Sequence, residues 1–213
     1  MELLYADKRI AVAVKPPGSS APTSPAACRS CCGPAGHPCI RTVHRLDAAT
    51  GGVMVFARSA AAASILSGQV RDHRFRKIYL AVVRGDPGQG GIWRDMLGRD
   101  PVRRVTYIAR EPEKDVRPAE LSYETLAVRE GLSLVRVTLH TGRTHQIRVQ
   151  FAGRGFPLVG DRKYGGAGDG ETLALWAWRL GFTHPETGRD MVFTHQPPAA
   201  WPWTLFPLPE TGK

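Results

Sequence analysis

The sequence lacks any apolar run long enough to cross a membrane. Its longest apolar runs, residues 53–57 and 78–83, have the length of a β-strand, whereas a transmembrane helix needs about 20 such residues. The first residues carry Glu2 and Asp7 where a secretory leader would carry basic residues, and they have no apolar centre. We therefore expect a cytoplasmic protein with no membrane partner.

Cysteine is confined to one short segment, at Cys28, Cys31, Cys32 and Cys39, with His37 among them. A zinc site needs four donors arranged as a tetrahedron, and the first cysteine pair has suitable spacing. His37 and Cys39 are separated by only one residue, which fits ligand spacing poorly. The segment is rich in Pro and Gly, so we expect an irregular insertion over 19–40 with reduced thiols and no metal. Zinc binding is the alternative.

Acidic residues are few: 19 Asp and Glu face 29 Lys and Arg, which gives a net charge of +10. Most of the basic residues are arginine, whose guanidinium binds phosphate through two parallel hydrogen bonds and stacks on bases. The excess favours a nucleic-acid partner. The alternative is a composition bias of a GC-rich genome, which raises Ala, Gly, Pro and Arg together.

Internal repeats are absent, and so is the alternation of strand and helix that a doubly wound sheet requires. Apolar and alternating patterns predict strands in two hairpins, one within 3–15 and one formed by 120–128 and 132–139. Further strands are expected over 41–46, 53–57 and 78–83. Residues 85–118 are rich in Gly and charge and are expected to form a loop or an extended hairpin.

Only two helices are expected. Ser59 is a suitable N-cap for a helix that ends near Arg71, and residues 144–152 form an apolar pattern that Gly153 closes. With strands dominant and paired in hairpins, the pattern predicts an α+β fold with an antiparallel sheet.

One carboxylate stands out in the sequence HRLDAATGG at residues 44–52. Asp47 follows an expected strand and precedes small residues that favour a turn. Strand alternation would place Arg45 and Asp47 on the same face. In a basic protein, such a carboxylate is either a structural turn former or a nucleophile.

Four sequence blocks together identify a family. They are HRLDAATGG at 44–52, KIYLA at 77–81, GRTHQIR at 142–148 followed by PLVGD at 157–161, and LWA at 175–177 followed by LGFTHP at 180–185. In this order they resemble an RluA-type pseudouridine synthase, and the resemblance runs from about Leu3 to the C-terminal tail. It implies a bent, mostly antiparallel mixed sheet flanked by a few helices, in a single catalytic domain over 1–213.

The same resemblance implies the activity. The enzyme detaches uracil from its ribose, turns the base over and reattaches it through carbon, with no metal and no cofactor. No S4-like RNA-binding domain is expected before Met1. The target nucleotide must leave its stack, so a stem-loop of rRNA or tRNA is the expected substrate.

The resemblance also assigns roles to five residues. Asp47 is the essential carboxylate, and whether it attacks the sugar, attacks the ring or removes a ribose proton is left open. Arg143 pairs with that carboxylate, with phosphate contact as its alternative role. Tyr79 stacks on the base and is a possible acid–base group, with a place in the core as the alternative. Arg45 fills the vacated stack or grips the flipped phosphate, and Leu175 packs below the base.

Other positions of the blocks are given supporting roles or depart from the family. His145 and Gln146 are expected to orient their loop, and Arg148 to be structural or to contact phosphate. The family usually has Ser where this chain has Gly51, and His where it has Trp176.

Two other classes compete with this interpretation. One is a catalytically inactive RNA-binding protein of the same fold. The other is a hydrolytic glycosidase, which needs two carboxylates and for which Asp161 is the candidate partner of Asp47. We predict an RNA pseudouridine synthase, monomeric and without an obligate protein partner.

Overall fold

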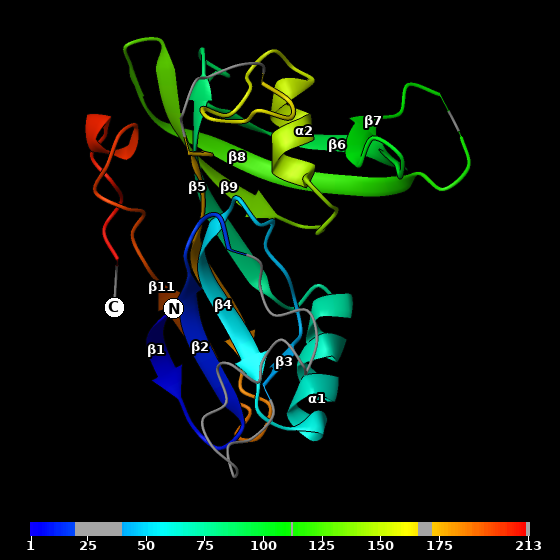
Figure 1. The fold of residues 1–213 in the computed structure, drawn as a ribbon, viewed down its shortest axis with the longest axis vertical. Coiled ribbons are helices and arrows are strands. Elements are labelled where there is room, and N and C mark those ends of the chain that lie inside the picture. Colours follow the sequence, from blue (N-terminus) through cyan, green and yellow to red (C-terminus); the bar gives the residue numbers. More distant parts are fainter. Residues whose placement is uncertain (20–39, 112, 166–171, 212–213) are drawn as a thin grey trace. The chain divides into compact units, whose positions relative to one another are not determined.

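The computed structural model describes residues 1–19, 40–111, 113–165 and 172–211. The cysteines and His37 lie outside these residues. The chain divides into two units: the first comprises 1–77 and 177–195, and the second comprises 78–176 and 196–213 (Figure 1). Strands β5 (Arg76–Arg84) and β10 (Leu175–Thr183) carry the chain from one unit into the other.

The first unit has the strand order β1-β2-β4-β10, with β11 paired to β10 and β3 paired to β4. The pairs β1–β2, β2–β4, β3–β4 and β10–β11 are antiparallel. Their bounds are β1 Glu2–Ala6, β2 Ile10–Lys15, β3 Arg41–Thr42, β4 Gly51–Ala57 and β11 Asp190–Thr194. Strands β2 and β4 are buried along their whole length, and their register pairs Ile10 with Ala57 and Lys15 with Gly52. Lys15 is therefore a buried lysine at the end of β2, next to the start of β4.

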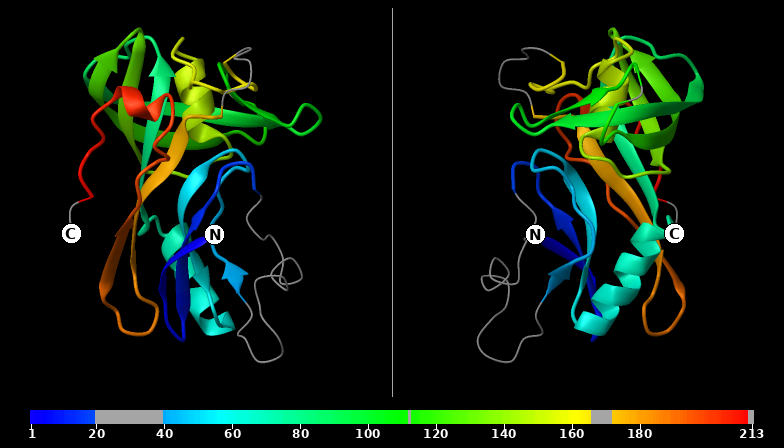
Figure 2. Two further views of the ribbon diagram at one scale, coloured as in Figure 1. Left: turned by 60° about the vertical axis from the view of Figure 1, so that its left-hand side comes forward. Right: turned by 90° about the vertical axis from the view of Figure 1, so that its right-hand side faces the viewer.

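Helix α1 (Ala60–Arg71) covers this sheet (Figure 2). The Ser59 hydroxyl accepts a hydrogen bond from the Ala62 N–H at 3.1 Å and so caps the helix, as the sequence predicts. The apolar side of α1 then packs onto strand residues and Phe75. The core of this unit consists of Ile10, Val12, Val53, Val55, Ala57, Ala62, Leu66, Phe75, Leu180 and Phe182.

The second unit has the strand order β5-β9-β8-β6-β7. The bounds are β6 Gly90–Asp100, β7 Val105–Ile108, β8 Arg117–Arg129 and β9 Leu132–Leu139. Glu130 and Gly131 both have positive φ, at 53° and 72°, and Arg129 pairs with Leu132. This two-residue turn matches the twist of the flanking strands, so the predicted β8–β9 hairpin is confirmed.

Helix α2 (Gln146–Ala152) has no exposed face over its first six residues, Gln146 to Phe151. Phe151 meets the Trp93 ring with centroids 4.6 Å apart, and Trp93 meets Tyr123 at 4.4 Å. Because the helix is enclosed, its polar residues must find partners inside the unit.

The sequence prediction needs two corrections of element bounds. The strand expected over 41–46 is limited to Arg41–Thr42, and residues 43–47 lie outside any strand. The second helix starts at Gln146 rather than at residue 144, because His145 adopts the left-handed conformation with φ 54°. Of the two forms expected for residues 85–118, the structure has the extended hairpin, formed by β6 and β7.

The predicted α+β class with a mostly antiparallel sheet is confirmed. No helix among the described residues has the length and apolarity that a membrane crossing requires.

Candidate active-site residues

Asp47 lies on a turn of the first unit. Its carbonyl accepts the Thr50 N–H at 3.0 Å, which closes a tight turn over the two alanines between them. Although residues 45–47 are not in a strand, their exposure alternates: Arg45 is exposed, Leu46 is buried and Asp47 is half-buried. The buried leucine anchors the segment, and the two charged residues flank it.

His44 fixes the start of this segment. Its Nε2 accepts the N–H of Val55 at 3.1 Å, so this nitrogen carries no hydrogen and the imidazole is neutral. Burial, with the charge of Lys77, lowers the pKa of His44 to about 3. Both observations indicate that His44 has a structural role.

The buried Lys15 ammonium holds the backbone next to Asp47 through hydrogen bonds. Its side chain is 1% exposed, and Nζ donates to the carbonyls of Pro16, Ser19 and Ala48 at 3.0, 2.6 and 3.0 Å. Burial lowers the pKa of Lys15, and the Asp47 carboxylate opposes that shift. Sequence reasoning missed this residue, because a lysine at the end of a strand is normally exposed.

Gly52 follows the Asp47 turn, and the backbone of Ala177 on β10 lies very close to it. Its φ is 121°, and a Cβ at this position would lie 2.3 Å from the carbonyl oxygen of Ala177. Only glycine fits such a position. The second glycine of the HRLDAATGG block is therefore required by the way β4 lies against β10.

The predicted pocket residues of the second unit lie in its buried strands. Tyr79 is on β5 with 8% exposure, and Leu175 is the first residue of β10 with 5% exposure. Ala174, directly before Leu175, accepts the Val82 N–H and donates its own N–H to Val159. These bonds fix the Leu175 backbone relative to the end of β5.

Arg143 is held by a network built around Gln146. The Gln146 Oε1 accepts the Arg143 N–H at 2.9 Å and the Thr141 hydroxyl at 2.9 Å, and its Nε2 donates to the Glu120 carbonyl at 3.1 Å. The Arg143 Nε donates to the carbonyl of Pro118 at 2.9 Å, which orients the guanidinium. Gln146 thus orients the loop.

Arg148 and Asp161 form a buried ion pair. The guanidinium Nε and Nη2 meet the two carboxylate oxygens at 2.8 and 2.7 Å, and the Asp161 side chain is 0% exposed. Oδ1 also accepts the N–H groups of Lys163 and Tyr164. Arg148 is therefore structural, and Asp161 is fully engaged by four donors. A carboxylate so engaged does not support the glycosidase hypothesis.

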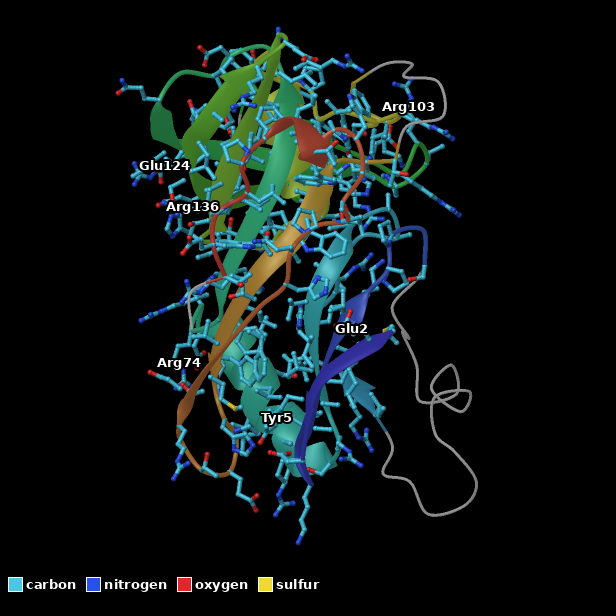
Figure 3. All side chains as sticks on the ribbon, turned by 90° about the vertical axis from the view of Figure 1, so that its left-hand side faces the viewer. Glu2, Tyr5, Arg74, Arg103, Glu124 and Arg136 are labelled. Carbon is cyan, nitrogen blue, oxygen red and sulfur yellow. The ribbon has the colours of Figure 1, made fainter. Side chains whose placement is uncertain are left out.

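The histidine of the LGFTHP block, His184, bonds Asp7 in the turn of the first hairpin. His184 Nδ1 accepts the N–H groups of Glu186 and Thr187, so its Nε2 carries the hydrogen that bonds Asp7 at 2.8 Å. Burial of Asp7 alone would raise its pKa. Hydrogen bonds from the N–H groups of Ile10 and Arg9 and from Tyr5 and His184 outweigh this and lower the pKa of Asp7 to about 2. Tyr5 lies on β1 (Figure 3).

The predicted residues are thus divided between the units. Arg45 and Asp47 belong to the first unit, and Tyr79, Arg143 and Leu175 belong to the second. The expected pairing of Asp47 with Arg143 stays a prediction. Over the described ranges, no group of three or more His, Cys, Asp or Glu side chains is arranged to hold a metal ion.

A family model described as RNA pseudouridylate synthase matches residues 3–153. The chain belongs to this family. Its matched region contains the Asp47 turn, the Tyr79 strand and the Arg143 loop, so the resemblance inferred from the four blocks is confirmed.

Curated relatives agree with the assignment. The chain is 43% identical over 160 residues to an uncharacterized RNA pseudouridine synthase of Chloroflexus aurantiacus. This alignment covers 74% of this chain and 50% of the relative. It is 34% identical over 161 residues to the ribosomal large subunit pseudouridine synthase D of Nitrosomonas europaea, covering 71% and 46%. The chain therefore spans about half the length of the relatives that it matches.

A solved structure, human RNA pseudouridylate synthase domain containing 1, superposes with a TM-score of 0.78 at 24% identity. The match covers 93% of this chain and 84% of the human chain. It shows that the two proteins share the fold.

Proposed function

We propose that this protein isomerises uridine to pseudouridine in structured RNA. The observation that carries the proposal is the family match over residues 3–153, which includes an aspartate on a turn held by a buried lysine. In the reaction the C1′–N1 bond breaks, the base rotates, and a C1′–C5 bond forms. C5 loses its hydrogen as a proton and N1 gains one, so the product is an isomer of the substrate.

Five residues are proposed to divide the work. Asp47 supplies the carboxylate that acts on the nucleoside, and Arg143 holds that carboxylate. Tyr79 stacks on the base and serves as an acid–base group at C5, while Leu175 packs against the opposite side. Arg45, which is exposed beside Asp47, grips the flipped nucleotide or fills its vacated place. Extrusion of the nucleotide requires a few kcal/mol, which RNA contacts must supply.

The relatives named for the ribosomal large subunit favour rRNA as the substrate class, with tRNA as the alternative. We further propose that the protein works as a monomer in the cytoplasm, as a single catalytic domain and without a cofactor. Whether the cysteine segment binds zinc is decided by elemental analysis of the purified protein.

The test uses RNA labelled with tritium at C5 of uridine, because isomerisation releases this tritium to water. The substrates are rRNA and tRNA isolated from a strain that lacks the protein, so that their target uridines are unmodified. We expect release by the wild type, with Asp47→Asn inactive but still able to bind RNA. Binding without release by the wild type would instead identify an inactive RNA-binding protein of this fold.

A further inference from the structure

The turn between β6 and β7 presents side chains to solvent in a fixed conformation. The Asp100 carboxylate accepts the N–H groups of Val102 and Arg103, both at 2.9 Å, and so caps the turn. Arg104 completes it with φ 54°. Val102 is 89% exposed at the tip.

A second segment lies against this turn and adds to its charge. The Lys163 ammonium donates to the carbonyl of Arg104 at 2.9 Å. The Lys163 backbone is fixed by the buried Asp161 carboxylate. We call the exposed cations of these two segments the basic turn; they are Arg99, Arg103, Arg104, Arg162 and Lys163.

The basic turn has an excess of positive charge. Of the acids within 99–104 and 161–163, Asp161 is buried against Arg148, and Asp100 is occupied by the turn backbone. Arg103 approaches Asp100 only at 3.8 Å and keeps 82% of its side chain exposed (Figure 3). By contrast, Arg94 and Arg136 of the same unit each bond a glutamate, Glu120 and Glu124.

The basic turn is connected to the Arg143 loop by hydrogen bonds within the second unit. Thr106 on β7 donates its N–H to the Tyr164 hydroxyl at 2.8 Å and its hydroxyl to the carbonyl of Thr144 at 2.9 Å. His145 Nδ1 bonds the same Tyr164 hydroxyl at 2.7 Å. A ligand on the basic turn is therefore held at a fixed place relative to the loop that carries Arg143.

We propose that the basic turn binds the phosphate backbone of the RNA substrate, as a contact surface separate from the residues that act on the base. The inference rests on the proposed function for the identity of the ligand. Among the described residues, the cations of the basic turn have one ion-pair partner, Asp100 at 3.8 Å from Arg103, so the cluster keeps an excess of positive charge. Such a cluster favours a polyanion over an acidic side chain, and each phosphate contact releases counterions. Val102 at the tip adds an apolar contact to the sugar or to an exposed base.

The experiment compares two double variants of equal charge. Arg103→Gln with Arg162→Gln removes two cations of the basic turn, and Arg94→Gln with Arg136→Gln removes two cations that are already paired with glutamates. The probe is a fluorescein-labelled RNA stem-loop with uridines in its loop. Anisotropy gives its dissociation constant between 50 and 200 mM salt. Thermal melting checks that both variants fold.

We expect the basic-turn variant to bind about tenfold more weakly at 0.1 M salt and to lower the slope of log Kd against log salt by about 2. The control variant should change Kd less than about threefold. Equal losses in the two variants, no loss in the basic-turn variant, or no RNA binding by the wild type would overturn the proposal.

Tritium release separates this proposal from the proposed function. Release by the wild type combined with equal binding of both variants would refute the basic turn and leave the activity standing. Selective loss of binding in the basic-turn variant, with no release by the wild type, would support the RNA surface and refute the activity.

Discussion

The ammonium of Lys15 donates to the carbonyl of Ala48, the residue directly after Asp47, at 3.0 Å. Ala48 also accepts the Gly18 N–H at 2.9 Å, so both interactions fix the same carbonyl. The backbone of the turn directly after Asp47 is therefore held by a buried charge at the end of β2. Charge-assisted hydrogen bonds of this kind are roughly twice as strong as neutral ones.

Replacement of Lys15 by Met should keep the side-chain volume and remove the three hydrogen bonds. We expect a loss of about 1–3 kcal/mol in the free energy of unfolding, because the carbonyls of Pro16, Ser19 and Ala48 each lose a charge-assisted hydrogen bond. We also expect a fall in kcat of about 10- to 100-fold, since the Asp47 turn loses its brace. Urea denaturation and tritium release measure the two effects. Lys8→Met, at an exposed position of the same unit, is the control.

The close approach of Gly52 to Ala177 gives a second prediction. Gly52→Ala would place a Cβ 2.3 Å from a backbone oxygen and also strain a residue with φ 121°. We expect a loss of more than about 3 kcal/mol in unfolding free energy, measured by urea denaturation. Gly18→Ala separates the two effects, because Gly18 has φ 80° but open space around it. It should cost only about 1 kcal/mol, and an equal loss in both variants would show that the close approach is unimportant.

The buried pair of Arg148 and Asp161 should be far more important for stability than an exposed pair. Removal of one partner leaves an uncompensated buried charge, so Asp161→Asn should destabilise the protein by about 3–5 kcal/mol. The exposed pair of Glu124 and Arg136 lies on neighbouring strands β8 and β9 (Figure 3), and Glu124→Gln should cost less than about 1 kcal/mol. Chemical denaturation of the wild type and the two variants measures the loss of unfolding free energy in each variant. Similar midpoints for the two variants would contradict this ranking.

Local patterns predicted the elements whose residues interact with near neighbours in the sequence. The Ser59 cap and the two hairpins of 3–15 and 120–139 are examples, since capping and turn chemistry act over a few residues. Helix α2 was misjudged at its start because an enclosed helix has no polar face to define its bounds. Arg148 and Gln150 are buried there: Arg148 bonds Asp161, and the Gln150 Nε2 donates to Asp95.

Long-range partners were beyond sequence reasoning. Nothing in the sequence near Lys15 indicates three carbonyl acceptors, one of them 33 residues away. The bond between Asp7 and His184 spans 177 residues. The candidate residues Asp47, Tyr79 and Arg143 came from the family resemblance, because a single carboxylate on a turn is not specific to one reaction.

The bond between Asp7 and His184 predicts an acid-sensitive contribution to stability. The pKa of Asp7 is lowered to about 2 in the folded protein, below the ordinary value of 3.8. The carboxylate therefore stabilises the fold above the unfolded pKa, and this contribution is lost as the pH falls from about 4 through 2. Asp7→Asn should reduce the free energy of unfolding by about 1–3 kcal/mol at pH 7.

Urea denaturation of the wild type and of Asp7→Asn between pH 7 and pH 2.5 measures this contribution. The difference between the two proteins should be constant from pH 7 to about 5 and should shrink below pH 4. Glu186→Gln removes an exposed carboxylate that pairs with Arg9, and it should change stability by less than about 1 kcal/mol at any pH. The prediction is wrong if the difference in unfolding free energy between wild type and Asp7→Asn is the same at pH 3 and pH 7. The charge on Asp7 would then not stabilise the contact between the first hairpin and the β10–β11 turn.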